Sequence, residues 1–214
     1  MKGLLRKAYC YGNYFIEIVT LVKTALWYKC LFGHIGQKSK IFKPLRLINP
    51  QNVYIGDGVR IYKHSRIETI ESWGKKKYTP KIKIGNNTSI EQRLHLTCAS
   101  EVEIGENVVI LADVMITDIN HKYSEINKNV MLQDLDVKET RIGNHCFIGM
   151  GARIMAGSKL GDNCIVGANS VVIGEFQGYC VLAGSPAVII KRYDFEKGVW
   201  RRTNKKGEFI EDVT

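Results

Sequence analysis

Residues 141–172, RIGNHCFIGMGARIMAGSKLGDNCIVGANSVV, place an aliphatic residue at every sixth position. A period of six cannot keep one face of an α-helix apolar, and a simple strand would alternate every second residue. Short straight segments that turn through equal corners would point each aliphatic side chain inward and stack it on its counterpart one turn away. The stretch therefore predicts a solenoid. Its inward series is Ile142, Ile148, Ile154, Leu160, Val166 and Val172.

Three earlier runs keep the same step of six, so the solenoid extends well beyond this stretch. If three hexads form one triangular coil, the repeats amount to roughly six to seven coils. A glycine follows the first aliphatic residue of each run, and we expect these glycines to relieve corners where φ is unusual. The earlier runs are Ile55, Ile61 and Ile67, then Ile84, Ile90 and Leu96, then Ile104, Ile110 and Ile116.

The composition suits one domain with a core of ordinary size. The chain has 214 residues, of which 45% are hydrophobic, and its net charge of +10 favours anionic partners. We do not expect nucleic acid among them, because the basic residues lie in separate places with no recognition helix or RNA-binding signature between them. Six cysteines without a CxxC pair favour free thiols in a reducing cytoplasm over disulfides.

Three motifs resemble the hexapeptide-repeat acyltransferases, and within them the branch of maltose and galactoside O-acetyltransferases and bacterial glycan O-acetyltransferases. They are the repeat at 142–172, the closing segment VLAGSPAVIIKR at 181–192, and ITDINHKY at 116–123. The resemblance implies an all-β fold, a left-handed parallel β-helix. The residue pattern outside the repeat adds an N-terminal amphipathic helix and a short C-terminal cap. The left hand rests on the resemblance alone, because parallel crossovers are ordinarily right-handed.

On this basis the chain divides into three segments. Residues 1–40 are expected to form an N-terminal helical segment, residues 41–190 the β-helix, and residues 191–214 a basic tail. Two stretches lack the sixfold pattern, at about 71–81 and at 118–139, and we expect them to leave the solenoid as loops, where function tends to collect.

The first of these stretches reads ESWGKKKYTPK and contains three consecutive lysines. Two interpretations of it are open. It is either a solvated loop or a contact for an anionic acceptor, in which Trp73 or Tyr78 stacks on a sugar face.

Residues 2–32 predict an amphipathic helix. Glu17, Lys23 and Lys29 interrupt its apolar run, so we expect neither a membrane span nor a cleavable signal peptide. Its apolar stripe either packs against the first coil as a cap or touches a bilayer surface in a peripheral membrane contact. The stripe consists of Leu4, Ala8, Tyr11, Phe15, Ile18, Val22 and Leu26, and the opposite side carries Arg6, Asn13, Glu17, Thr20 and Thr24.

The resemblance assigns catalytic roles to the start of the second interruption. His121 matches the general base that the family uses in acetyl transfer to a hydroxyl, and Asp118 either holds this histidine in the useful tautomer or serves a turn. The chemistry is sensible, because an alcohol is a poor nucleophile and an imidazole can remove its proton as attack proceeds. Related enzymes usually have a histidine where Ile119 stands. His95 is the predicted substrate-positioning residue.

The resemblance also implies acetyl-CoA as co-substrate and no metal, since a thioester needs none. Its contacts fall on Met150, Ala168, Ile173, Gly174 and Lys191. The family commonly has Thr-Lys at positions 173 and 174, so contacts there would come from the backbone and the CoA phosphates would rely on Lys191. A homotrimer is expected, with acetyl-CoA between the parallel faces of neighbouring chains.

The implied function is an acetyl-CoA-dependent O-acetyltransferase of a sugar hydroxyl, in surface polysaccharide or lipopolysaccharide biosynthesis, located in the cytoplasm or peripheral to the inner membrane. N-acetylation of a nucleotide-linked amino sugar, O-acetylation of an antibiotic and a non-catalytic β-helix scaffold are the alternatives, because the fold alone does not choose among them. A γ-class carbonic anhydrase is disfavoured, since it needs three histidines on zinc and no second histidine lies within four residues after His121.

Overall fold

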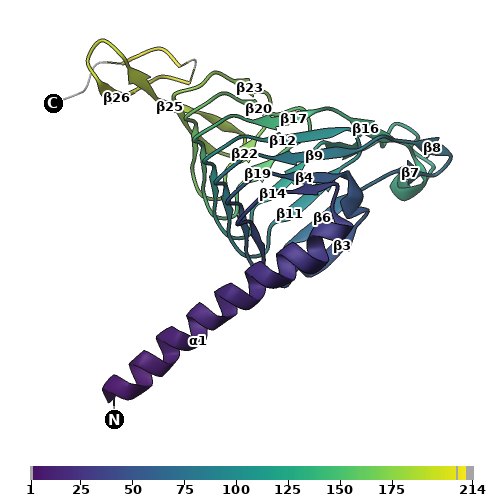
Figure 1. The fold of residues 1–214 in the computed structure, drawn as a ribbon. Coiled ribbons are helices and arrows are strands. Elements are labelled where there is room, and N and C mark those ends of the chain that lie inside the picture. The colour runs from purple at the N-terminus through teal and green to yellow at the C-terminus, as the bar shows by residue number, and fades with distance from the viewer. Residues whose placement is uncertain (1, 206, 211–214) are drawn as a thin grey trace.

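The repeat forms a three-sided parallel solenoid (Figure 1). The computed structural model describes residues 2–205 and 207–210, apart from the side chains of residues 4 and 8. Each coil contributes one short strand to each of three sheets, which we call faces 1, 2 and 3 in chain order. Face 1 has seven strands and face 3 has six, in agreement with the predicted number of coils.

The strands of each face come from successive coils. Face 1 consists of β1 (His34–Ile35), β4 (Val53–Ile55), β9 (Lys81–Ile84), β12 (Glu101–Ile104), β17 (Thr140–Ile142), β20 (Lys159–Leu160) and β23 (Glu175–Phe176). Face 2 consists of β2 (Lys40–Ile41), β5 (Arg60–Ile61), β10 (Ser89–Ile90), β13 (Val109–Ile110), β18 (Phe147–Ile148), β21 (Ile165–Val166) and β24 (Cys180–Gly184). Face 3 consists of β3 (Arg46–Ile48), β6 (Arg66–Thr69), β11 (His95–Cys98), β14 (Met115–Thr117), β19 (Arg153–Ile154) and β22 (Val171–Val172).

The core is the predicted column of aliphatic residues. Every member of the four sixfold runs has 2% or less of its surface exposed. On face 2, for example, Ile90, Ile110 and Ile148 are partners in successive parallel strands and stack directly on one another. Full burial of such a side chain contributes about 1.5–3 kcal/mol. The prediction of inward-pointing aliphatic residues is confirmed, and we call each of these stacked residues a rung.

The glycines that follow the rungs were expected to relieve corners of unusual φ, and this expectation is wrong. Gly143 does not adopt a left-handed φ; that conformation falls two residues later, at His145, whose φ is 56°. Gly143 is needed for close approach instead, because a Cβ there would lie 2.6 Å from the backbone carbon of Gly161 on the next coil. Neighbouring coils are only about 4.8 Å apart at a β-sheet spacing, which leaves no room for a side chain directed along the stack.

The N-terminal helix projects away from the solenoid (Figure 1). It begins with α1 (Lys2–Lys23) and continues through the π-helical turn η1 (Thr24–Tyr28) into the short α2 (Lys29–Leu31). Only its last turns pack on the first coil. No helix among the described residues is long and apolar enough to cross a bilayer.

The face of this helix that contacts the solenoid carries Thr20, Thr24 and Tyr28 and none of the predicted stripe. Thr20 and Thr24 are buried, and the Thr24 hydroxyl accepts a hydrogen bond of 2.9 Å from the amide of Ile41, on the outermost strand of face 2. The expectation that the apolar stripe caps the first coil is therefore wrong, since Phe15 is 66% exposed. An end strand presents unpaired backbone N–H groups, which need acceptors rather than apolar surface. The predicted stripe residues Leu4 and Ala8 lie outside the described side chains.

The far end of face 2 is extended by two antiparallel strands, β25 (Ala187–Asp194) and β26 (Val199–Arg202). The predicted boundary between residues 190 and 191 falls inside β25, so the start of the basic tail is part of the sheet. All six cysteines are free thiols, and four of them are buried in the solenoid.

Candidate active site

Both interruptions of the repeat leave the solenoid at the same corner, where face 3 turns into face 1. The first follows β6 and forms the hairpin of β7 (Ser72–Trp73) and β8 (Lys76–Lys77). The second follows β14 and contains β15 (Ile119–His121), the 3₁₀ turn η3 (Val130–Leu132) and β16 (Leu135–Val137). Only β11 separates β6 from β14 on face 3, so the two excursions are neighbours. We call residues 71–80 and 118–139 together the tip (Figure 1).

Asp118 fixes the start of the second excursion. Its carboxylate is fully buried and accepts hydrogen bonds from the amides of Ala99, at 2.8 Å, and Ser100, at 2.6 Å. Burial raises the pKa of Asp118 above its ordinary value, and the two amides act in the opposite direction. The carboxylate thus serves a turn, one of the two roles considered from the sequence. A direct action of Asp118 on His121 stays a prediction.

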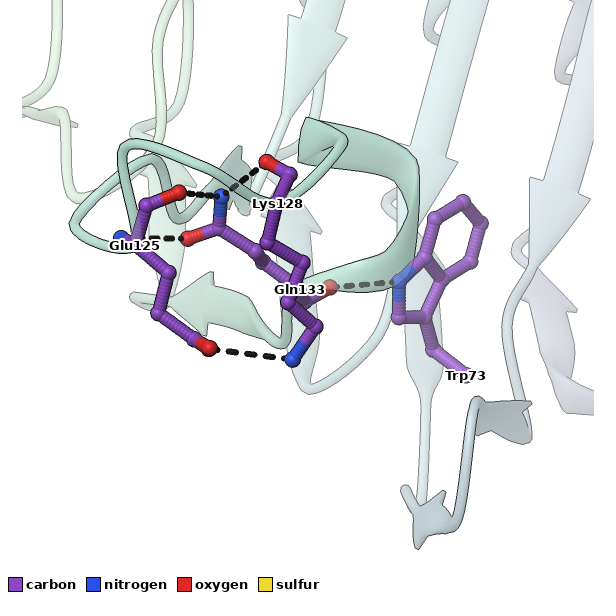
Figure 2. Close-up of polar contacts among 4 residues, drawn as sticks. All are labelled: Trp73, Glu125, Lys128 and Gln133. Carbon is purple, nitrogen blue, oxygen red and sulfur yellow. Dashed lines mark hydrogen bonds and ion pairs between the residues drawn. The ribbon is translucent and has the colours of Figure 1, made fainter.

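Gln133 organises the interior of the loop. Its side-chain oxygen accepts a hydrogen bond from the amide of Glu125, and its side-chain nitrogen donates to the carbonyls of Glu125 and Lys128, all at 2.9–3.0 Å (Figure 2). The residue is 2% exposed. One buried amide therefore satisfies three backbone groups of a segment that has few strand or helix bonds of its own. Nothing in the sequence pattern singled out this residue.

Trp73 links the hairpin to the loop. Its indole N–H donates a hydrogen bond of 2.9 Å to the Gln133 carbonyl, across 60 positions of sequence (Figure 2). The same indole meets the His121 ring edge-on, with ring centroids 5.3 Å apart and planes inclined by 65°. Aromatic pairs favour this geometry. The hairpin is thus neither a purely solvated loop nor solely an acceptor contact, because its tryptophan packs against the candidate base.

His121 itself is exposed at the mouth of a hollow. The antiparallel pairing of β15 with β16 sets its backbone opposite Leu135, a buried residue that anchors the loop. The hollow is lined by Asn120, His121, Lys122, Tyr123, Ser124, Asp136 and Lys138. An imidazole in this position can reach the proton of a bound hydroxyl, as general base catalysis requires.

His95 lies on face 3, one corner before the tip. In the parallel register its neighbours are Arg66 on β6 and Met115 on β14. Burial lowers the pKa of His95 below its ordinary value, and the Arg66 charge acts in the same direction. The structure does not bring His95 into the hollow beside His121, and its predicted contact with substrate stays a prediction.

The predicted cofactor residues fall at two different corners. Met150 and Ala168 lie one coil apart where face 2 turns into face 3, and both are exposed. Ile173 and Gly174 lie where face 3 turns into face 1, the corner from which the tip leaves, and Ile173 is 57% exposed. Lys191 is an exposed residue of β25. Contact of these residues with a cofactor stays a prediction.

Histidine, cysteine, aspartate and glutamate side chains form no group of three or more suited to a metal ion within residues 2–205 and 207–210.

Comparison with known proteins identifies the repeat. Residues 139–174 match the family described as bacterial transferase hexapeptide (six repeats). A putative lipopolysaccharide biosynthesis O-acetyl transferase of Escherichia coli, WbbJ, is 32% identical over 124 residues, which are 55% of this chain and 63% of that protein. The chain thus spans less than two thirds of that relative's length.

Solved structures share the fold. AntD, an N-acyltransferase from Bacillus cereus in complex with dTDP and 3-hydroxybutyryl-CoA, superposes with a TM-score of 0.62 at 18% identity, over 79% of this chain and 88% of that chain. The hexapeptide-repeat acetyltransferase VCA0836 from Vibrio cholerae, complexed with acetyl coenzyme A, gives a TM-score of 0.57 at 18% identity, over 84% of each chain. At such identities the likeness shows the fold alone.

Fold and repeat together define a left-handed parallel β-helix, as the resemblance implied. Within this fold, residues 139–174 carry the repeat described for the bacterial hexapeptide transferases.

Proposed function

We propose that this protein transfers an acetyl group from acetyl-CoA to a hydroxyl of a sugar in a surface polysaccharide or lipopolysaccharide precursor. The observation that carries the proposal is the exposed imidazole of His121, which lines an open hollow and is braced by Trp73. The name of the relative from Escherichia coli supports this class of acceptor. The complex of VCA0836 with acetyl coenzyme A supports the donor.

In the proposed step the acceptor hydroxyl oxygen attacks the carbonyl carbon of the thioester. His121 takes the hydroxyl proton as the new C–O bond forms. The tetrahedral intermediate then collapses with cleavage of the C–S bond, and the imidazolium of His121 returns its proton to the departing sulfur, leaving the O-acetyl sugar and free CoA. No group beyond acetyl-CoA and the acceptor is consumed.

The positions of the cofactor residues favour a homotrimer with the cofactor between chains. Met150 and Ala168 are separated from Ile173 and Gly174 by the length of a strand of face 3. One extended cofactor that runs along a single corner would contact only one of these two groups in a given chain. If a corner of one chain lies beside a different corner of its neighbour, both groups face the same cofactor. Closed cyclic assembly is the common way to build such a shared site.

Charge around the hollow suits an acceptor that carries phosphate. Lys122 and Lys138 line it; Lys138 forms an ion pair of 3.5 Å with Asp136, the one carboxylate of the lining, so Lys122 supplies the net positive charge. The chain as a whole has a net charge of +10, which would attract anionic molecules over long range. A sugar linked to a nucleotide or to a lipid pyrophosphate has this chemistry, and both are precursors on the cytoplasmic side of the membrane.

The test is acetyl transfer by the purified protein to a panel of acceptors, read by mass spectrometry of the product. His121→Ala should lower kcat by about 10²- to 10⁴-fold, the range for loss of a general base, while acetyl-CoA affinity by calorimetry stays unchanged. His34→Ala is the matched control, because His34 is an exposed histidine on face 1 of the first coil. Equal turnover of both variants would contradict the assignment of the base.

The acceptor panel separates the alternatives. It should contain a lipid-pyrophosphate-linked sugar, a free sugar, a nucleotide-linked amino sugar and an antibiotic with a free hydroxyl. Acetylation of only the amino sugar would move the protein to N-acylation, the chemistry named for AntD. Absence of acetyl-CoA binding would leave a non-catalytic scaffold. A molecular mass in solution other than that of a trimer would remove the shared cofactor site.

A further inference from the structure

The last turns of the N-terminal helix contact the protein through its polar side, and its apolar side faces solvent. Thr20 and Thr24, on the polar side, are buried on the first coil, and Glu17 on the same side forms an ion pair of 2.5 Å with Lys40. In an ordinary surface helix the apolar side faces the core and the polar side faces water. The arrangement is reversed here, so the chain itself does not cover the apolar side in this structure.

That apolar side is wide and aromatic. At 100° per residue it takes up more than half of the circumference of α1. Its described residues are 43–73% exposed. They are Leu5, Tyr9, Tyr11, Tyr14, Phe15, Ile16, Ile18, Val19 and Val22. A contiguous apolar patch of this kind on a soluble chain marks a surface for a partner or a membrane.

The charges on and around this surface are positive. Lys7 stands near its beginning and Lys23 near its end, and Lys29 follows in α2, all with exposed side chains. Glu17, the only acidic residue between positions 2 and 31, is occupied by Lys40. Lysines that flank an apolar face rich in tyrosine and phenylalanine are typical of helices that lie in the interface of an anionic bilayer.

We propose that α1 binds flat on an anionic bilayer surface, with its apolar side among the acyl chains and its lysines at the lipid headgroups. The helix spans about 33 Å along its axis at 1.5 Å per residue, enough for several lipid contacts without crossing the membrane. The attachment to the solenoid through Thr20 and Thr24 leaves this side free. The proposal stands apart from acetyl transfer, because none of its residues belongs to the tip.

Flotation of the full chain with lipid vesicles tests it. Wild type should float with vesicles of phosphatidylcholine containing about 30% phosphatidylglycerol and bind pure phosphatidylcholine vesicles less well. Binding should weaken as NaCl is raised, because salt screens the lysines. Phe15→Ser with Val19→Ser should lower the apparent partition coefficient at least about tenfold through lost apolar burial. Asn13→Ser, on the polar side, is the matched control and should bind like wild type.

Lys7→Gln with Lys23→Gln separates the electrostatic contribution, since it should weaken binding to the anionic vesicles and leave binding to neutral ones unchanged. Failure of wild type to float with anionic vesicles would overturn the proposal. It would also be overturned if Phe15→Ser with Val19→Ser floated normally but lowered the molecular mass in light scattering, because the apolar side would then pair with a second copy of the chain. Either outcome leaves the acetyl-transfer assay untouched.

Discussion

In the coils each strand meets the strand before and the strand after it through the same parallel register, and the same kind of aliphatic residue fills the interior at every level. In the tip the contacts do not repeat from one level to the next. Gln133 is bonded to three backbone groups of its own loop, and Trp73 joins two excursions that lie far apart in sequence. The coils draw stability from repetition, whereas the tip draws its shape from single side chains.

This difference separates stability from chemistry. A rung has equivalent neighbours above and below it, so the solenoid is cooperative over several coils. The tip adds little to the aliphatic column, and Ile126 within it is 94% exposed. Substitutions in the coils should therefore act on the free energy of unfolding, and substitutions in the tip on turnover.

The largest effect is expected from a rung. Ile110→Ala removes a fully buried side chain between Ile90 and Ile148 and should lower the free energy of unfolding by about 2–5 kcal/mol, through lost burial and the cavity left behind. Urea denaturation followed by circular dichroism measures it. Ile126→Ala makes the same chemical change in the tip and should shift the midpoint hardly at all. Equal losses in the two variants would mean that the tip is part of the cooperative unit.

The same contrast decides what the sequence could predict. The rungs could be predicted because all fifteen aliphatic positions share one spacing and occupy equivalent places in the coil. The meeting of Trp73 with His121 was not readable, since it requires that two excursions leave the same corner two coils apart. Gln133 gave no signal, because a buried amide in an irregular loop has no period.

For the N-terminal helix, the sequence predicted the element but not the side that contacts the solenoid. Its periodicity correctly predicted a helix, but amphipathicity does not say which side meets the protein. Two threonines and a glutamate make the polar contacts because the end strand offers a free amide at Ile41 and a lysine at position 40. The same segment buries Tyr28 and Phe32 in the core, so the junction combines hydrogen bonds with apolar contacts that the predicted stripe does not make.

A medium effect is expected at the link between hairpin and loop. Trp73→Phe keeps a ring against His121 but removes the donor to the Gln133 carbonyl. The lost hydrogen bond weakens the attachment of the loop to the hairpin by about 0.5–1.5 kcal/mol, which corresponds to roughly a two- to tenfold loss of kcat. Trp73→Ala removes both contacts and should cost more. Steady-state kinetics together with thermal unfolding measure it.

For both Trp73 variants the midpoint of thermal unfolding should stay close to that of wild type, because the coils are untouched. A fall in thermal stability as large as that of Ile110→Ala would place Trp73 with the rungs. Unchanged kcat in Trp73→Ala would show that the indole does not position His121.

The smallest effect concerns His95, which belongs to a coil by position and to the site only by prediction. Burial and the charges of Arg66 and Arg153 lower its pKa, and Glu68 acts in the opposite direction. The unfolded chain therefore binds more protons than the folded one between the lowered pKa and the ordinary value near 6.5, so stability rises with pH through that window and is lost on acidification. His95→Gln removes this dependence, and the variant should lose less stability than wild type between pH 7 and pH 5. Urea midpoints at the two pH values measure it.

Two other shifted carboxyl groups do not affect this difference between variant and wild type. Asp113, whose pKa the Arg93 guanidinium lowers, titrates below the window. The raised pKa of Asp118 adds a slope of opposite sign, which both proteins share. Identical pH slopes for variant and wild type would show that burial on face 3 does not lower the pKa of His95. If kcat falls as well while the slope changes as expected, His95 joins the tip in function although it is built as part of a coil.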